Sequence, residues 1–201
     1  MKKLVVALFL AVALVVPALA DKPNMELIPK IGFLFSPEMT AKVDGKTASD
    51  SKDSAFSIGA DFFFDLDNNL FVGAGLVWGS NHKVDDYSDN KFGFTNLYAE
   101  VKYKFLLNGS EDNPFFLYPL AQLGIGAPGW DVDLPGRVWD YEIEPGAYWG
   151  LGAGVEIANI IVEFIYGCNY ATEKYSSPSG SHKKDFSYTA FRINVGYKFN
   201  I

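Results

Sequence analysis

The last fourteen residues of the chain, Tyr188 to Ile201, alternate between apolar and polar side chains. The apolar parity carries Thr189, Phe191, Ile193, Val195, Tyr197, Phe199 and Ile201. Because successive side chains of a β-strand point to opposite faces, this stretch predicts a strand with one apolar and one polar face. It is longer than the usual strand of roughly 5–6 residues and long enough to cross a bilayer, which takes about 9–11 tilted residues.

Seven other segments have the same two-faced pattern. In one of them, Leu97 and Val101 share the apolar face, whereas Glu100 and Lys102 share the polar face. Together with the C-terminal stretch, the predicted strands are 25–35, 54–64, 70–79, 92–105, 115–126, 147–157, 160–170 and 188–201.

The connections between these segments alternate in length. Long polar connections are predicted at 36–53, 80–91, 127–146 and 171–187, and shorter ones at 65–69, 106–114 and 158–159. This alternation is typical of barrels whose strands run up and down through a membrane. The predicted fold class is therefore all-β, an eight-stranded antiparallel up-and-down transmembrane β-barrel, with the long connections at one end and the short ones and both termini at the other.

A soluble barrel, which buries its apolar face and exposes its polar one, is the alternative. The pattern alone does not say which face lies inside. The polar faces, however, contain many of the 19 glycines and few charges, whereas a water-facing exterior carries many more Lys and Glu side chains. Small residues with a few charges favour a crowded barrel interior.

Residues 1–20 have the pattern of a secretory signal peptide. Lys2 and Lys3 precede an apolar run, and Ala18 and Ala20 form a small-residue cleavage pattern, so we expect a mature barrel domain over 21–201. Removal of the two lysines leaves 15 basic side chains against 24 acidic ones, a net charge of −9. This acidic balance argues against nucleic acid as a partner. A lone cysteine, Cys168, excludes an intrachain disulfide.

The whole predicted mature chain resembles the small eight-stranded outer-membrane barrels of Gram-negative bacteria, the OmpX/OmpA-like group. Members typically end in an aromatic residue that the outer-membrane assembly machinery recognises; here Tyr197 and Phe199 fit that signal, and Ile201 replaces the final aromatic. The resemblance implies location in the cell outer membrane, with the termini and short turns in the periplasm. Outer-membrane lipids, lipopolysaccharide and the assembly machinery are the implied partners.

An eight-stranded barrel leaves a lumen just wide enough to be filled by side chains. The inward-facing charges predict a network inside it, formed by Lys30, Asp61, Glu100, Lys102, Glu163, Arg192 and Lys198, with Lys104 and Glu156 on the same parity. We expect Lys30 close to Asp61, and Lys198 close to both Glu163 and Lys30. Buried charges require partners, so a paired network that plugs the lumen is the favoured interpretation. A narrow pore is the alternative.

Candidate chemistry is sparse. The two histidines, His82 and His182, fall in long connections, and Ser181 precedes His182. Some barrels of the family that this chain resembles are lipid A acyltransferases or deacylases that use such residues. A serine hydrolase needs a specific geometry rather than adjacency, so no catalytic residue is assigned. Asp65 and Asp67 fit a turn better than a calcium loop. No metal or cofactor is expected.

The third long connection is the strongest candidate for binding. Trp139 and Tyr141 alternate with acidic residues, and Trp130 lies on the other side of a predicted turn at 134–137. We expect the strands on both sides to continue as a protruding hairpin that displays these aromatics to a surface protein ligand. Packing among the loops or at the membrane headgroups is the alternative.

The resulting expectation is a monomeric, non-enzymatic integral outer-membrane protein. It would support envelope integrity or surface interaction through long extracellular loops. A lipid A-modifying enzyme of the outer leaflet and a narrow small-solute pore are the alternatives.

Overall fold

The computed structural model describes residues 24–43, 46–51, 54–80, 82–85, 88–110, 113–131, 140–177 and 180–201. The predicted signal peptide, 1–20, lies outside the described residues. Within the described part, the chain forms strands joined by turns, and no helix there has the length and apolar content that a membrane span requires.

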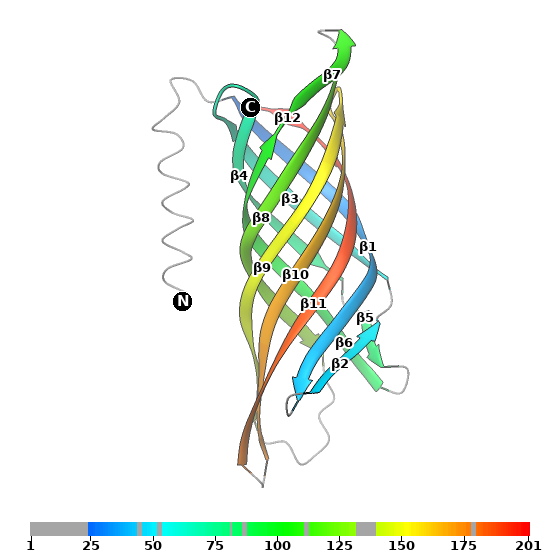
Figure 1. Ribbon diagram of the computed structural model, residues 1–201, viewed down its shortest axis with the longest axis vertical. Coiled ribbons are helices and arrows are strands. Elements are labelled where there is room, and N and C mark those ends of the chain that lie inside the picture. Colours follow the sequence, from blue (N-terminus) through cyan, green and yellow to red (C-terminus); the bar gives the residue numbers. More distant parts are fainter. Residues whose placement is uncertain are drawn as a thin grey trace.

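Eight long strands form a closed wall (Figure 1). They are β1 (Met25–Val43), β3 (Ala55–Asp65), β4 (Leu70–Gly79), β6 (Ser88–Tyr103), β8 (Asn113–Asp131), β9 (Asp140–Ile157), β10 (Ile160–Ser177) and β11 (Gly180–Tyr197). Each pairs antiparallel with the next along the chain. Pairing of β11 with β1 closes the ring. The predicted eight-stranded antiparallel barrel is confirmed.

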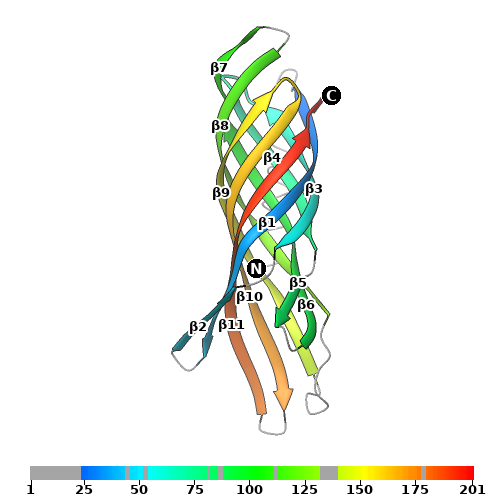
Figure 2. The same ribbon diagram turned by 90° about the vertical axis from the view of Figure 1, so that its right-hand side faces the viewer.

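Four short strands extend this wall. They are β2 (Lys46–Ser51), β5 (His82–Asp85), β7 (Phe105–Ser110) and β12 (Phe199–Asn200), which pair with β1, β6, β8 and β1 respectively. Figures 1 and 2 place β7, β12 and the C-terminus at one end, here named the turn end. They place β2, β5 and the adjoining ends of β10 and β11 at the other, here named the hairpin end.

Two connections at the turn end are tight turns, as the sequence predicts. Between β3 and β4, Asp67, Asn68 and Asn69 have φ angles of 69°, 53° and 67°. Asp and Asn tolerate this left-handed region better than most residues. The Asp65 carboxylate accepts the backbone N–H of Asp67 at 3.0 Å. These acidic residues therefore serve turn geometry. Between β9 and β10, Ala158 has a φ of 53°.

The long connections differ from their prediction because much of their length is strand. The segment 171–187 was expected to be a loop, but β10 and β11 pair without interruption as far as Ser177 and Gly180. Likewise β1 continues to Val43 and pairs with β2. The apolar alternation ends where the wall stops facing lipid, whereas the backbone ladder continues through polar residues.

The expected hairpin between 127 and 146 is wrong in its pairing. β8 and β9 do extend, but their mutual ladder stops at Gly126 and Gly146. Beyond that point β8 pairs with β6 and β9 pairs with β10. In a continued β8–β9 ladder, Pro145 would face residue 127 and Pro128 would face residue 144. Proline has no backbone N–H to donate, so the two strands separate there.

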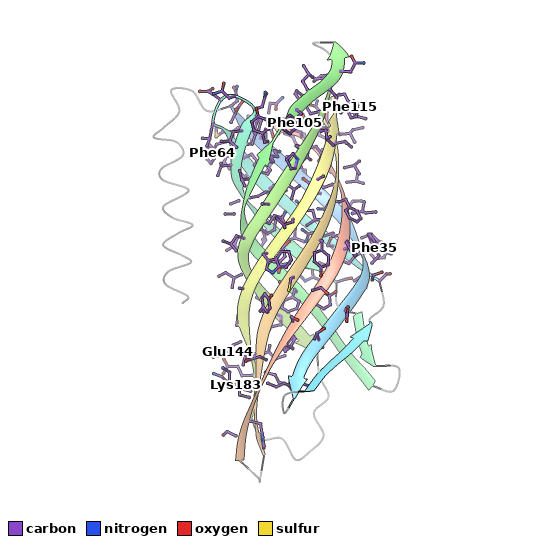
Figure 3. The ribbon with its side chains drawn as sticks, in the orientation of Figure 1. Phe35, Phe64, Phe105, Phe115, Glu144 and Lys183 are labelled. Atoms are coloured by element: carbon purple, nitrogen blue, oxygen red, sulfur yellow. The ribbon has the colours of Figure 1, made fainter. Side chains whose placement is uncertain are left out.

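The apolar face points outward and the polar face points inward. On β3, the side chains of Phe56 and Ile58 are 69% and 58% exposed, whereas Asp61 is 1% exposed. Figure 3 draws the side chains along the length of the wall and labels Phe35 and Phe105 among them. Such an exterior suits hydrocarbon and excludes the soluble barrel, which exposes its polar face.

One outward-facing residue is less exposed than the alternating pattern predicts. Cys168 has the same parity as Val162 and Phe164, which predicts contact with lipid, but only 3% of its surface is exposed. Its cross-strand partners are Trp149 and Thr189. Larger neighbouring side chains therefore cover the thiol on the outer face.

Candidate functional site: the charged lumen

Aromatic side chains fill the middle of the lumen. Tyr98, Tyr118 and Tyr148 are at most 1% exposed. A Cβ added at Gly75 would meet the ring of Tyr98, and one at Gly154 would meet the ring of Tyr118. The inward-facing glycines therefore make room for the large rings, which explains why the polar faces of the strands combine these two residue types.

The central group of charges surrounds Lys30, which is 4% exposed. Its ammonium donates to the carboxylate of Asp61 and, at 3.3 Å, to Glu163. Asp61 also accepts the hydroxyl of Tyr98 at 2.8 Å. Glu163 also accepts the hydroxyl of Tyr118 at 3.2 Å. Each charge in this group therefore has several partners, as a buried charge requires.

A second chain of polar contacts begins at Glu100 and ends at Arg192. The amide of Gln122 donates to Glu100 at 2.6 Å, and its oxygen accepts the hydroxyl of Tyr148. Arg192 donates through Nη2 to Gln122 at 3.3 Å and to Tyr148 at 3.4 Å. In the described part of the chain, no carboxylate lies within 4.0 Å of this guanidinium, which distinguishes Arg192 from the lysines.

The turn-end group joins three lysines to two glutamates. Glu26 accepts from Lys102 at 3.0 Å and from Lys104 at 2.6 Å. Glu156 forms an ion pair with Lys104 at 2.8 Å and accepts a hydrogen bond from Lys198. The Lys102 ammonium also lies 3.6 Å from the centroid of the Phe63 ring, and the Lys104 ammonium lies 4.1 Å from that of Phe71. Cation–π contacts therefore add to the ion pairs.

The two groups of charges and Arg192 balance one another. The cations are Lys30, Lys102, Lys104, Arg192 and Lys198, and the anions are Glu26, Asp61, Glu100, Glu156 and Glu163. Five basic and five acidic side chains occupy the lumen of the described barrel. This balance reduces the desolvation cost of burying charge in a lumen packed with side chains.

The structure distributes the predicted network residues over the central group, the turn-end group and the chain of contacts from Glu100 to Arg192. Lys30 and Asp61 meet as expected, whereas Lys198 pairs with Glu156 instead of approaching Glu163. Sequence analysis missed Glu26, although it lies within the predicted strand 25–35 and has the same parity as Lys30. Register pairs Lys30 with Gly196, so Lys198 lies further toward the turn end.

One cluster has the composition of a metal site. Carboxylate oxygens of Asp61, Glu100 and Glu163 lie within 4.8 Å of one another. Oxygen ligands of this kind suit hard cations. The ammonium of Lys30 already bonds two of the three carboxylates. The lysine thus supplies the positive charge that a metal ion would bring.

The loop residues singled out by sequence lie in part on strands and in part outside the described residues. Trp139 lies outside the described residues. In the backbone ladders, Trp130 pairs with Phe92 of β6, whereas Tyr141 pairs with Tyr175 of β10. The two strands that carry these aromatics therefore belong to different ladders. Figure 3 shows Glu144 and Lys183 at this hairpin end.

The Ser181–His182 pair has the wrong local geometry for a catalytic dyad. Both residues lie on β11, and neighbouring side chains of a strand project to opposite faces. Both are exposed at the hairpin end. His82 lies on β5. The strand geometry therefore separates Ser181 and His182.

Comparison with known proteins gives the same architecture. The chain is similar to the crystal structure of Neisserial surface protein A, with 17% identity and a TM-score of 0.51 over 87% of this chain and 97% of that one. It is also similar to the outer membrane protein OprG from Pseudomonas aeruginosa, with 15% identity and a TM-score of 0.54 over 89% of this chain and 97% of that one. At these identities the likeness shows the fold alone.

Sequence comparison finds a curated relative and a family. An uncharacterized protein of Pasteurella multocida is 37% identical over 57 residues, which span 28% of this chain and 24% of the relative. The model of the outer membrane protein beta-barrel domain matches residues 5–199. With its closed wall, apolar exterior and charged lumen, the chain belongs to the outer membrane protein β-barrel domain family and is a protein of the outer membrane.

Proposed function

We propose that this chain is a non-enzymatic outer-membrane barrel that supports envelope integrity or surface interaction through its long hairpins. The observation that carries the proposal is the packed lumen, where five basic and five acidic side chains lie among aromatic rings. A pore needs a continuous aqueous path, and Lys30, Glu163 and Tyr118 close the middle of this one through mutual contacts. The lumen therefore favours a structural role over conduction.

The hairpin end is the part of the molecule that extends beyond the closed wall. β10 and β11 continue past Asn169 and Tyr188 through eight further pairs of described residues, beginning with Tyr170 and Ser187. This extension carries polar and charged side chains, and Lys174 of β10 forms an exposed ion pair with Glu144 of the neighbouring strand β9 at 2.7 Å. We infer that lipopolysaccharide or a surface protein contacts these hairpins, and that the barrel is a monomer inserted by the assembly machinery.

The experiment compares a strain that lacks the protein with strains that produce either the full chain or a shortened chain. In the shortened chain, a two-residue turn replaces 172–185, so that the wall stays intact. The full chain should restore the resistance of the cells to detergent, or their binding to a surface. The shortened chain should restore neither, although both chains fold in the membrane. Equal rescue by both chains would contradict a role of this hairpin.

A conductance measurement separates this proposal from the pore alternative. The purified barrel in planar bilayers should give no stepwise ion current at neutral pH. Regular current steps that disappear when Lys30 is replaced would favour the narrow pore instead.

A further inference from the structure

One connection at the turn end is a protruding hairpin rather than a tight turn. β7 follows β6 along the chain and pairs with β8 as far as Ser110 and Asn113. Figures 1 and 2 show that β7 and the adjoining part of β8 extend further than the other strands at this end. The two segments, 105–110 and 113–117, are here named the turn-end hairpin.

The turn-end hairpin exposes apolar side chains on both of its faces. Phe105, Leu106 and Leu107 follow one another on β7 and are 50%, 60% and 54% exposed. Because neighbouring side chains of a strand project to opposite faces, these three residues cover both sides. Across the ladder, Leu106 pairs with Phe116, which is partly exposed. The hairpin therefore departs from the wall, where one face is apolar and the other carries the charges of the lumen.

This apolar surface continues the lipid-facing side of the wall. Tyr103 of β6 and Leu117 of β8 face outward and are 39% and 40% exposed. The ring of Phe105 packs against that of Tyr103, with 4.8 Å between their centroids. The segments 105–110 and 113–121 contain no charged residue. A contiguous exposed apolar patch marks a contact surface, and here the patch is continuous with the surface that meets lipid.

The second edge of β7 limits how deep the hairpin can lie in a bilayer. Among the described strands, β7 pairs with β8 alone, and the last bond toward β4 joins the Lys104 N–H to the carbonyl of Asn69 at 2.9 Å. Hydrocarbon cannot satisfy the backbone groups of an open strand edge. Glu111 and Asp112 follow β7 in the sequence, and carboxylates also resist hydrocarbon. The headgroup boundary supplies water for these groups and hydrocarbon for the leucines.

We propose that the turn-end hairpin is a phospholipid-contact surface, which inserts Leu106 and Leu107 at the boundary between headgroups and acyl chains of the leaflet at the turn end. In the predicted orientation this is the periplasmic leaflet. The hairpin makes the apolar band longer on one side of the barrel than on the others. A membrane accommodates such a mismatch through tilt of the protein or local thickening of the bilayer.

The test uses the full barrel folded in phosphatidylcholine vesicles, with nitroxide labels on single cysteines in a Cys168→Ser background. Labels on the Leu106→Cys and Leu107→Cys variants should contact oxygen dissolved in lipid more than a water-soluble nickel complex. The matched control is Lys183→Cys on the exposed, charged extension of β11, where the nickel complex should have the greater contact. Equal nickel contact at 107 and 183 would overturn the proposal. Spin–spin broadening at 107 that unlabelled protein dilutes away would assign the surface to a second copy and overturn it too.

A second experiment tests the leucines themselves, with the label on Asn108→Cys beside them. Replacing both leucines, by Leu106→Ser and Leu107→Ser, should raise nickel contact and lower oxygen contact at this label, because the hairpin loses the apolar groups that hold it at the lipid. Ile58→Ala removes an exposed apolar side chain from the wall instead and should leave both contacts unchanged. Unchanged contacts in the folded double variant would overturn the proposal.

Discussion

At the scale of single residues, the alternation of side chains predicts which residues enter the lumen but not which of them meet. Lys102 and Glu26 form an ion pair although β3 and β4 separate their strands in the sheet. Contacts across a lumen depend on strand tilt and on the stagger of the register around the whole ring. Sequence analysis could therefore place Lys30 beside Asp61 on neighbouring strands, whereas the partners of Lys198 required the closed barrel.

Replacing Glu163 tests the central group of charges. Glu163→Ala removes the acceptor of Lys30, Tyr118 and Asn194. Breaking a buried pair costs about 3–5 kcal/mol, so the variant should unfold at a clearly lower urea concentration. The control is Glu144→Ala, whose ion pair with Lys174 is exposed and screened by solvent, so that the midpoint should hardly change. Equal midpoints for the two variants would mean that Glu163 is not part of a buried network.

Cys168 tests the packing of the outer face. Because neighbouring side chains cover the thiol, it should react slowly with an apolar maleimide as well as with a charged one in folded protein. A cysteine introduced by Val162→Cys, where the native side chain is 38% exposed, should react faster with the apolar reagent in a Cys168→Ser background. Rapid modification of native Cys168 by the charged reagent would contradict the apolar exterior.

At the scale of strands and hairpins, the pattern located every wall strand but set the hairpin-end limits too early. Periodicity reports which face of a strand meets lipid, so the signal ends at the membrane boundary. The extension of β10 and β11 to Ser177 and Gly180 depends on backbone hydrogen bonds that any polar residue can make. The separation of β8 and β9 could have been expected from Pro128 and Pro145, because proline has no backbone N–H to donate where the ladder stops.

Oxidative cross-linking tests the parting of these strands. Cysteines at 144 and 172 face each other across β9 and β10 and should form a disulfide in the folded barrel. Cysteines at 128 and 144 would face each other only in a continuous β8–β9 hairpin and should stay reduced. A disulfide between 128 and 144, with 144 and 172 remaining reduced, would support the hairpin that sequence analysis predicts and contradict the observed register.

At the scale of the whole molecule, the barrel has two different ends. The tight turns and the C-terminus lie at one end, and the long hairpins lie at the other (Figures 1 and 2). The alternation of connection lengths predicts this arrangement, because each strand crosses the same wall and reverses direction. The orientation in the membrane, with the hairpins outside the cell, stays a prediction.

Protease added to intact cells tests that orientation. Cleavage should occur within 36–53, 127–146 or 171–187, at the hairpin end, and the turn at Asp65–Asn69 should stay uncut. Cells opened before digestion provide the control for the turn end. Cleavage at Asp65–Asn69 in intact cells would reverse the orientation.

The most direct test of the barrel as a whole is accessibility along one strand in a lipid bilayer. Nitroxide labels on single cysteines would replace Ile161, Val162, Phe164 or Ile165 of β10 in a Cys168→Ser background. The outward positions 162 and 164 should contact oxygen dissolved in lipid. The inward positions 161 and 165, each 1% exposed in the native chain, should resist labelling or contact neither oxygen nor a water-soluble nickel complex. Access of the nickel complex to 161 or 165 would contradict the closed lumen, and contact of these positions with lipid would contradict the outward apolar face.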